Sequence, residues 1–167
     1  MKPLSALDDA ALRTLAERAG SLLLERGRRV ALAESCTGGW VTKCLTDVPG
    51  SSQWFERGYV TYSNAAKEQT LGVAASVLET FGAVSRPAAE QMAAGALHHS
   101  RATLAIAITG IAGPEGGTPV KPVGLVWFAR AQRDAAPLAL EEHFGGDREA
   151  IRRAAVATAL RLIIAAH

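Results

Sequence analysis

The chain has 167 residues, the length of one ordinary domain, and can bury a sizeable core. Hydrophobic residues make up 49% and charged residues 20%, which is close to the average of folded soluble proteins and excludes a chain dominated by disorder. The formal net charge of +2 gives no overall field that would require a nucleic-acid or membrane partner, so we expect neither.

The first half of the chain predicts two helices and two strands in alternation, followed by a further short helix. Apolar residues recur at helical spacing from Ser5, a plausible cap, to about Arg26, and Gly27 ends this helix. The short apolar run from Val30 to Ala33 predicts a buried strand. The elements that follow are a helical stretch over 40–45, an alternating strand over 58–62 and a short helix over 65–71.

The second half repeats this pattern. Ser85 caps a predicted helix with Pro87 in its first turn, and residues 104–109 form the most continuous apolar strand candidate. A strand pair over 123–129 and 138–144 precedes a last helix, which Asp147 can cap. This alternation predicts one layered α/β domain over residues 1–167, with helices on both faces of the sheet. Strand order does not follow from the pattern.

The N-terminus and the cysteines indicate a cytoplasmic protein. The first ten residues carry acidic groups and lack the apolar core of a secretory signal. Charge or glycine interrupts every apolar stretch well short of the roughly 20 residues of a membrane span. Cys36 and Cys44 are eight positions apart without a CxxC pattern, which argues against a zinc site or a disulfide scaffold.

Polar residues with catalytic potential follow the first strand, in the segment AESCTGG over 33–39. A buried strand that opens a helix here would point hydroxyls and backbone N–H groups at one spot, where an anion or an oxyanion is favoured. The glycines would let a ligand approach the backbone. A capped helix with two packing glycines explains the segment equally well.

A second cluster lies where the next strand meets its helix, at Tyr62, Asn64 and Lys67. An isolated lysine is most often a solvated surface charge. It becomes a base only when burial or a cationic neighbour lowers its pKa. The local sequence leaves both interpretations open.

Two further segments are typical of ligand contacts. The glycine-rich loop over 110–117 follows a buried strand but matches neither GxGxxG nor GxxxxGKS/T, so a plain connector remains an alternative. Arg148 and Arg152 are four residues apart near the start of the last helix, where guanidinium groups and the helix end would both suit a phosphate. Two solvated arginines paired with nearby acids explain the latter segment at least as well.

Taken together, these segments resemble the C-terminal domain of the competence/damage-inducible protein CinA. The matching stretches include AESCTGG at 33–39, GAVSRPAAEQMAAGAL at 82–97, TGIAGPEGG at 109–117 and FGGDREAIRRAA at 144–155. The resemblance covers nearly the whole chain in order, and AESCTGG together with TGIAGPEGG is highly specific. It implies a three-layer α/β/α domain with a mixed sheet of about five strands, and a homo-oligomer.

Stand-alone members of this family are nicotinamide-nucleotide amidohydrolases, so the resemblance implies hydrolysis of nicotinamide mononucleotide to nicotinic acid mononucleotide and ammonia, in NAD recycling and without a metal or cofactor. It implies Ser35 as nucleophile, Lys67 as its partner and Tyr62 beside them. The expected substrate-binding residues are Glu34, Cys36, Thr37, Gly38, Gly39, Asn64, Thr109, Gly110, Ile111, Gly113, Gly116, Gly117 and Arg148.

Three alternatives accompany this hypothesis. Cys36 is a rival nucleophile next to Ser35, but no histidine occupies a recognisable partner motif, so we favour serine. A metal hydrolase is disfavoured because no cluster of ligand residues at short spacing is present. A non-catalytic nucleotide-binding module linked to competence or DNA damage would keep the glycine loop and Arg148 without needing the Ser35–Lys67 pair.

Overall fold

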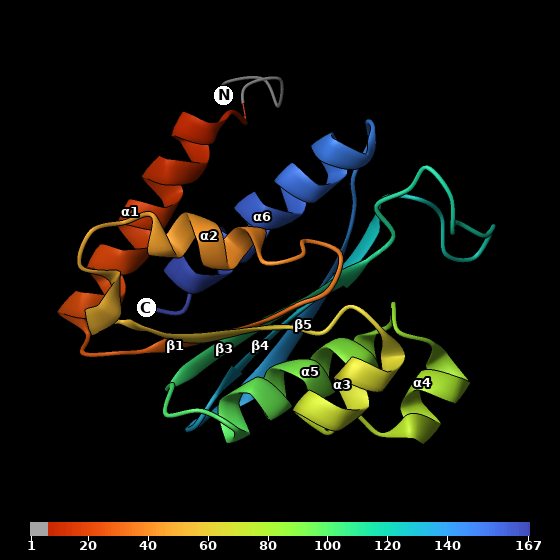
Figure 1. The fold of residues 1–167 in the computed structure, drawn as a ribbon, viewed down its shortest axis with the longest axis horizontal. Helices are drawn as coiled ribbons and strands as arrows, with labels where there is room; N and C mark the ends of the chain where they lie inside the picture. The colour runs from red at the N-terminus through yellow and green to blue at the C-terminus, as the bar shows by residue number, and fades with distance from the viewer. Residues whose placement is uncertain (1–6) are drawn as a thin grey trace.

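The computed structural model describes residues 7–167, which form a five-stranded sheet between two layers of helices (Figure 1). The elements are, in order, α1 (Asp9–Glu25), β1 (Val30–Glu34), α2 (Trp40–Thr46), the 3-10 helix η2 (Ser51–Gln53), β2 (Phe55–Val60), α3 (Asn64–Leu71), α4 (Ala75–Phe81), α5 (Arg86–His98), β3 (Leu104–Gly110), β4 (Leu125–Gln132), β5 (Ala135–His143) and α6 (Arg148–Ile164). The predicted three-layer α/β/α architecture is confirmed.

The sheet is mixed, with strand order β2-β1-β3-β4-β5. Strand β1 pairs in parallel with both β2 and β3, whereas β4 pairs antiparallel with β3 and with β5. Helices α1, α2 and α6 cover one face, and α3, α4 and α5 cover the other (Figure 1). Because the chain leaves β1 toward β2 over one face and returns to β3 over the other, the carboxyl ends of β1 and β3 flank a topological switch point, where α/β sheets bind ligands.

Alternation along the strands produces two cores of different character. In β1, Val30 and Leu32 pack toward α1 and α6, whereas Ala31 and Ala33 face the layer that contains α5. Small side chains on the second face let α5 approach the sheet closely. Both faces of β1 are therefore buried, and its carboxyl end is held rigidly in the centre of the sheet.

Several element boundaries differ from the sequence-based predictions. Helix α1 begins at Asp9 and is capped by Asp8, whose carboxylate accepts from the Ala11 N–H at 2.8 Å. The predicted cap, Ser5, lies outside the described residues. Strand β2 ends at Val60 rather than Tyr62, because the next two residues leave the sheet and turn their carbonyls to Lys67.

The remaining differences from the sequence-based predictions concern helix α4 and the ends of the hairpin strands. Helix α4 was not predicted, because it is seven residues long and its N-cap residue, Ala74, offers no side-chain hydrogen bond. The hairpin strands were predicted over 123–129 and 138–144, but the turn at Arg133 and Asp134 lets them extend to Gln132 and start at Ala135. None of the helices within residues 7–167 combines the length and hydropathy needed to cross a bilayer.

Candidate active site

The ends of the parallel strands bring a serine and a lysine from separate parts of the chain into contact. Ser35 follows β1 directly, and Lys67 lies in the first turn of α3, whose N-cap is Ser63. The Lys67 Nζ lies 3.0 Å from the Ser35 Oγ, although the two residues are 32 positions apart. The structure therefore assembles the pair that the family resemblance implied.

The surroundings of Lys67 favour an uncharged amine. Its side chain is only 1% exposed, and its Nζ lies 2.7 Å from the Thr61 carbonyl oxygen and 3.2 Å from that of Tyr62. Burial lowers the pKa of Lys67 below its ordinary value of 10.5, and no carboxylate within residues 7–167 bonds the amine to oppose this effect.

Hydrogen-bond counting gives the direction that the Ser35–Lys67 contact takes when the amine is neutral. A neutral amine has two N–H donors and one lone pair. The carbonyl oxygens of Thr61 and Tyr62 can only accept, so they take the two N–H groups. The lone pair is left for the hydroxyl proton of Ser35, which is the arrangement that a general base requires.

A pocket of about 280 Å³ opens in front of Ser35, whereas Lys67 is buried and does not line it. Nine of the predicted site residues line it: Ser35, Cys36, Tyr62, Thr109, Gly110, Ile111, Gly113, Gly116 and Arg148. The buried Thr109 hydroxyl donates to the Ala83 carbonyl at 2.9 Å, which ties the end of β3 to the connection between α4 and α5. The glycine loop forms one wall of the pocket.

Four lining residues were not predicted, namely Ala83, Val84, Ala112 and Glu115. Ala112 and Glu115 belong to the glycine-rich loop already singled out. The other two precede the Ser85 cap, and only the family-like stretch over 82–97 gave any signal there. Small apolar residues carry no chemical signature of their own in a sequence.

Tyr62 divides its contacts between its backbone and its side chain. Its carbonyl accepts from Lys67, but its phenol is 60% exposed and accepts a hydrogen bond from Arg148 Nη2 at 3.1 Å. Arg148 Nη1 donates to the Gly113 carbonyl at 2.7 Å. Arg148 therefore joins the start of α6 to the glycine loop at the pocket, and the Tyr62 hydroxyl points to it rather than to the lysine.

Glu34 has a role that differs from the expected substrate contact. Its carboxylate is fully buried and does not line the pocket. It accepts five hydrogen bonds, from the hydroxyls of Thr37 and Thr42 and from the N–H groups of Gly39, Val41 and Thr42. The N-terminus of α2 was expected to attract an anionic ligand, but the anion that it holds is this side chain.

Five other predicted contacts are also absent from the pocket wall. The Thr37 hydroxyl donates to Glu34 at 2.6 Å, and Asn64 is exposed at the start of α3. Gly38 and Gly39 adopt positive φ and line a separate hollow between α1, α2 and α6. Gly117 packs against Val123, where a Cβ would lie 2.8 Å from the Val123 nitrogen. These residues shape the loops around the pocket.

The structure disfavours the rival nucleophile. Cys36 is nearly buried, and burial raises the pKa of its thiol to about 12, so the reactive thiolate is scarce at neutral pH. No group of three or more His, Cys, Asp or Glu side chains suited to a metal ion occurs within the described part of the chain.

The backbone beside Ser35 offers two free donors. The N–H groups of Cys36 and Thr37 donate to no oxygen acceptor within residues 7–167. The neighbouring N–H groups are used: that of Ser35 donates to Ile108, and that of Gly38 donates to the Ser35 carbonyl at 3.0 Å. Two adjacent unpaired N–H groups next to a nucleophile are typical of an oxyanion hole.

Known proteins are similar to this chain over most of its length. The family model of the CinA C-terminal domain matches residues 12–166. The nicotinamide-nucleotide amidohydrolase PncC of Escherichia coli strain K12 is 52% identical over 157 residues, which cover 94% of this chain and 95% of that protein. Its namesake from Pseudomonas putida is 49% identical over 147 residues, covering 88% and 91%. The crystal structure of the competence/damage inducible protein CihA from Agrobacterium tumefaciens has a TM-score of 0.91 at 49% identity and covers 95% of each chain.

Proposed function

This chain belongs to the CinA C-terminal domain family, and we propose that it hydrolyses the carboxamide of nicotinamide mononucleotide through Ser35 and Lys67. The products are nicotinic acid mononucleotide and ammonia. The observation that carries the mechanism is the 3.0 Å contact between the serine hydroxyl and a buried amine with a lowered pKa, at the base of a pocket.

Acylation begins with proton transfer to the amine. Neutral Lys67 takes the Ser35 hydroxyl proton while Oγ forms a bond to the carboxamide carbon, and the carbonyl oxygen becomes an oxyanion. The free N–H groups of Cys36 and Thr37 are the nearest backbone donors for that charge.

Release of ammonia uses the same proton. The Lys67 ammonium donates it to the carboxamide nitrogen, the carbon–nitrogen bond breaks, and a nicotinoyl ester of Ser35 remains. A water molecule then gives one proton to Lys67 and bonds to the ester carbon. The lysine returns this proton to Oγ as the acid product leaves, so no proton donor beyond this pair is needed.

Substrate binding is assigned to the outer part of the pocket. Arg148 uses two of its five donor positions within the protein, on Gly113 and Tyr62, and has others left for the phosphate of the nucleotide. The glycine loop over 110–117 lies against the space for the ring and ribose. The side chains of Glu34 and Thr37 support the turn that carries the nucleophile instead of contacting the substrate.

The buried lysine argues against a non-catalytic binding module. Burying an amine without an acidic partner destabilises the fold, and a module that only binds a nucleotide gains nothing from it. The expectations of a cytoplasmic location, a homo-oligomer and a role in NAD recycling stay predictions.

An ammonia-release assay with nicotinamide mononucleotide tests the proposal, with nicotinamide and NAD as control substrates. The unmodified protein should release ammonia from the mononucleotide, and Ser35→Ala and Lys67→Met should each abolish release while remaining folded. Turnover retained by Ser35→Ala would refute the nucleophile assignment. Thermal stabilisation by the nucleotide without any ammonia from the unmodified protein would instead support the binding module.

A further inference from the structure

The turn that carries the nucleophile is bound from behind by an arginine of α6. Arg152 donates from Nε to the Cys36 carbonyl at 3.0 Å and from Nη2 to the Thr37 carbonyl at 3.1 Å. Its guanidinium lies 5.3 Å from the centre of the Trp40 ring. Arg152 lines the hollow of about 740 Å³ behind the turn and does not line the pocket in front of Ser35.

Arg152 donates the only hydrogen bond that the Cys36 carbonyl accepts within residues 7–167. The Ser35 carbonyl accepts from the Gly38 N–H, and the Thr37 carbonyl accepts from the Trp40 N–H as well as from the arginine. The Cys36 carbonyl, in contrast, accepts only from Arg152 among residues 7–167. Among the described residues, Arg152 is therefore the only group that hydrogen-bonds to the carbonyl of the peptide between residues 36 and 37.

Peptide geometry connects this contact to the reaction. In a planar trans peptide, the C=O and N–H bonds point in opposite directions. The Cys36 carbonyl accepts from Arg152, so the Thr37 N–H of the same peptide points away from that guanidinium, whereas Ser35 and Cys36, but not Arg152, line the pocket. A charged donor on the carbonyl also polarises the peptide and strengthens its N–H as a donor.

We propose that Arg152 is a positioning residue that aims the Thr37 N–H at the oxyanion of the tetrahedral intermediate. This inference rests on the proposed amidohydrolase function. Arg152 touches neither the substrate nor the nucleophile, and acts on the developing charge through one peptide group. Its removal should affect the transition state and leave ground-state binding unchanged.

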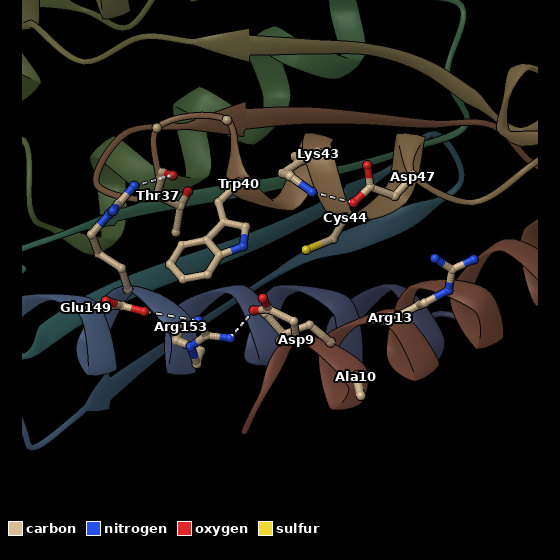
Figure 2. Close-up of a pocket in the computed structure, with 14 residues that line it drawn as sticks. Asp9, Ala10, Arg13, Thr37, Trp40, Lys43, Cys44, Asp47, Glu149 and Arg153 are labelled. Carbon is tan, nitrogen blue, oxygen red and sulfur yellow. Dashed lines mark hydrogen bonds and ion pairs between the residues drawn. The ribbon is translucent and has the colours of Figure 1, made fainter. Parts of the chain in front are cut away.

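The next residue provides a matched control. Arg153 lies over the same Trp40 ring, with its guanidinium 4.9 Å from the ring centre, and pairs with Asp9 and Glu149. Figure 2 shows the Trp40 ring extending from α2 toward α6, with Arg153 beneath it and joined to both carboxylates. Arg153 forms no hydrogen bond to the turn over 35–38. Arg153→Met thus removes an equal charge and a ring contact but no contact to the nucleophile turn.

The experiment compares Arg152→Met, Arg152→Lys and Arg153→Met in three measurements. These are kcat and KM for nicotinamide mononucleotide, the Kd of the acid product, and the Ki of the analogue whose carboxamide is replaced by an aldehyde. When Ser35 Oγ adds to the aldehyde carbon, the proton moves to Lys67 and the aldehyde oxygen becomes the oxyanion. The analogue therefore reports the oxyanion contact without a leaving group.

We expect Arg152→Met to lower kcat by roughly 10- to 100-fold, somewhat less than the 10²–10³ typical for removal of a whole oxyanion donor. The Ki of the aldehyde should rise by a similar factor, with KM and product Kd within about twofold of the unmodified protein. The kcat of Arg152→Lys should lie between those of Arg152→Met and the unmodified protein. A lysine ammonium can donate to one of the two carbonyls but cannot reproduce the paired donors of a guanidinium. Arg153→Met should keep kcat within about twofold.

Other outcomes overturn the inference. An unchanged kcat of Arg152→Met would show that Arg152 does not act on the oxyanion. The same conclusion would follow if KM and the product Kd rose and the aldehyde lost no more affinity than the product. If Arg152→Met does not fold, Arg152→Lys decides the matter by the same ratio of aldehyde to product affinity. If the unmodified protein releases no ammonia, the proposed function is refuted. If it is active and the Arg152 and Arg153 variants are equally active, only the inference on Arg152 is refuted.

Discussion

Glu34→Gln separates a structural role of Glu34 from the substrate contact expected from its motif. The substitution keeps the volume and removes the charge from a side chain whose two oxygens accept five hydrogen bonds. An amide nitrogen must replace one of the oxygens, and the less disruptive choice faces the Thr42 N–H and hydroxyl, at 2.7 and 2.9 Å. The Thr42 hydroxyl can rotate and accept from the amide, so only the Thr42 N–H loses its acceptor; one hydrogen bond to a charged group is worth about 1.5–3 kcal/mol, which is the expected loss.

This loss is large against the 5–15 kcal/mol total stability of ordinary domains. Urea unfolding should report it directly, and for a chain of this size the midpoint of thermal unfolding should fall by roughly 3–12 °C. The control is Glu68→Gln, on an exposed position of α3, which should change the free energy of unfolding by less than about 0.5 kcal/mol. The reasoning is refuted if Glu34→Gln is as stable as the control and only raises KM, since Glu34 would then be a substrate contact.

Four further predictions concern the candidate site. Cys36→Ala should retain ammonia release within a few-fold, because burial keeps the thiol protonated by raising its pKa to about 12; a loss beyond 100-fold would restore cysteine as the nucleophile. The value of kcat/KM should rise with pH through the lowered pKa of Lys67 and level off below 10.5, because only the neutral amine accepts the Ser35 proton. The unfolded chain binds more protons than the folded protein between that lowered pKa and 10.5, so the free energy of unfolding should rise with pH in this window; Lys67→Met should remove the rise in urea titrations. Arg148→Met should raise KM for nicotinamide mononucleotide by at least tenfold but leave turnover of the riboside, which lacks the phosphate, unchanged; equal effects on both substrates would contradict a phosphate contact.

Local sequence signals were sufficient for most of the secondary structure. The cap at Asp147, the glycine that ends α3 and the apolar run of β3 each act within a few residues, so their positions could be predicted without tertiary contacts. Helix α4 was missed because it has neither a capping side chain nor enough length for a periodic pattern. Its stability comes from packing, which local sequence does not encode.

The site was less accessible to the same reasoning. The motif over 33–39 predicted Ser35 as the nucleophile, but it did not distinguish the Ser35 hydroxyl, which faces the pocket, from the Glu34 carboxylate, which caps α2. Arg148 and Arg152 share one helical face by spacing, yet the first contacts the pocket wall and the second contacts the back of the turn. Because the two arginines are one turn of α6 apart, they contact different segments beside the start of that helix.

By itself, the sequence determined the order of the helices and strands except α4, the helices on both faces of the sheet and, through family resemblance, the hypothesis that Ser35 and Lys67 react together. Only the tertiary structure decided that Lys67 is buried without an acidic partner and that its Nζ lies 3.0 Å from the Ser35 Oγ. The physical reason is that a pKa depends on solvent exclusion and on partners from other segments. At Lys67 those partners come from the ends of two neighbouring strands that no local pattern joins.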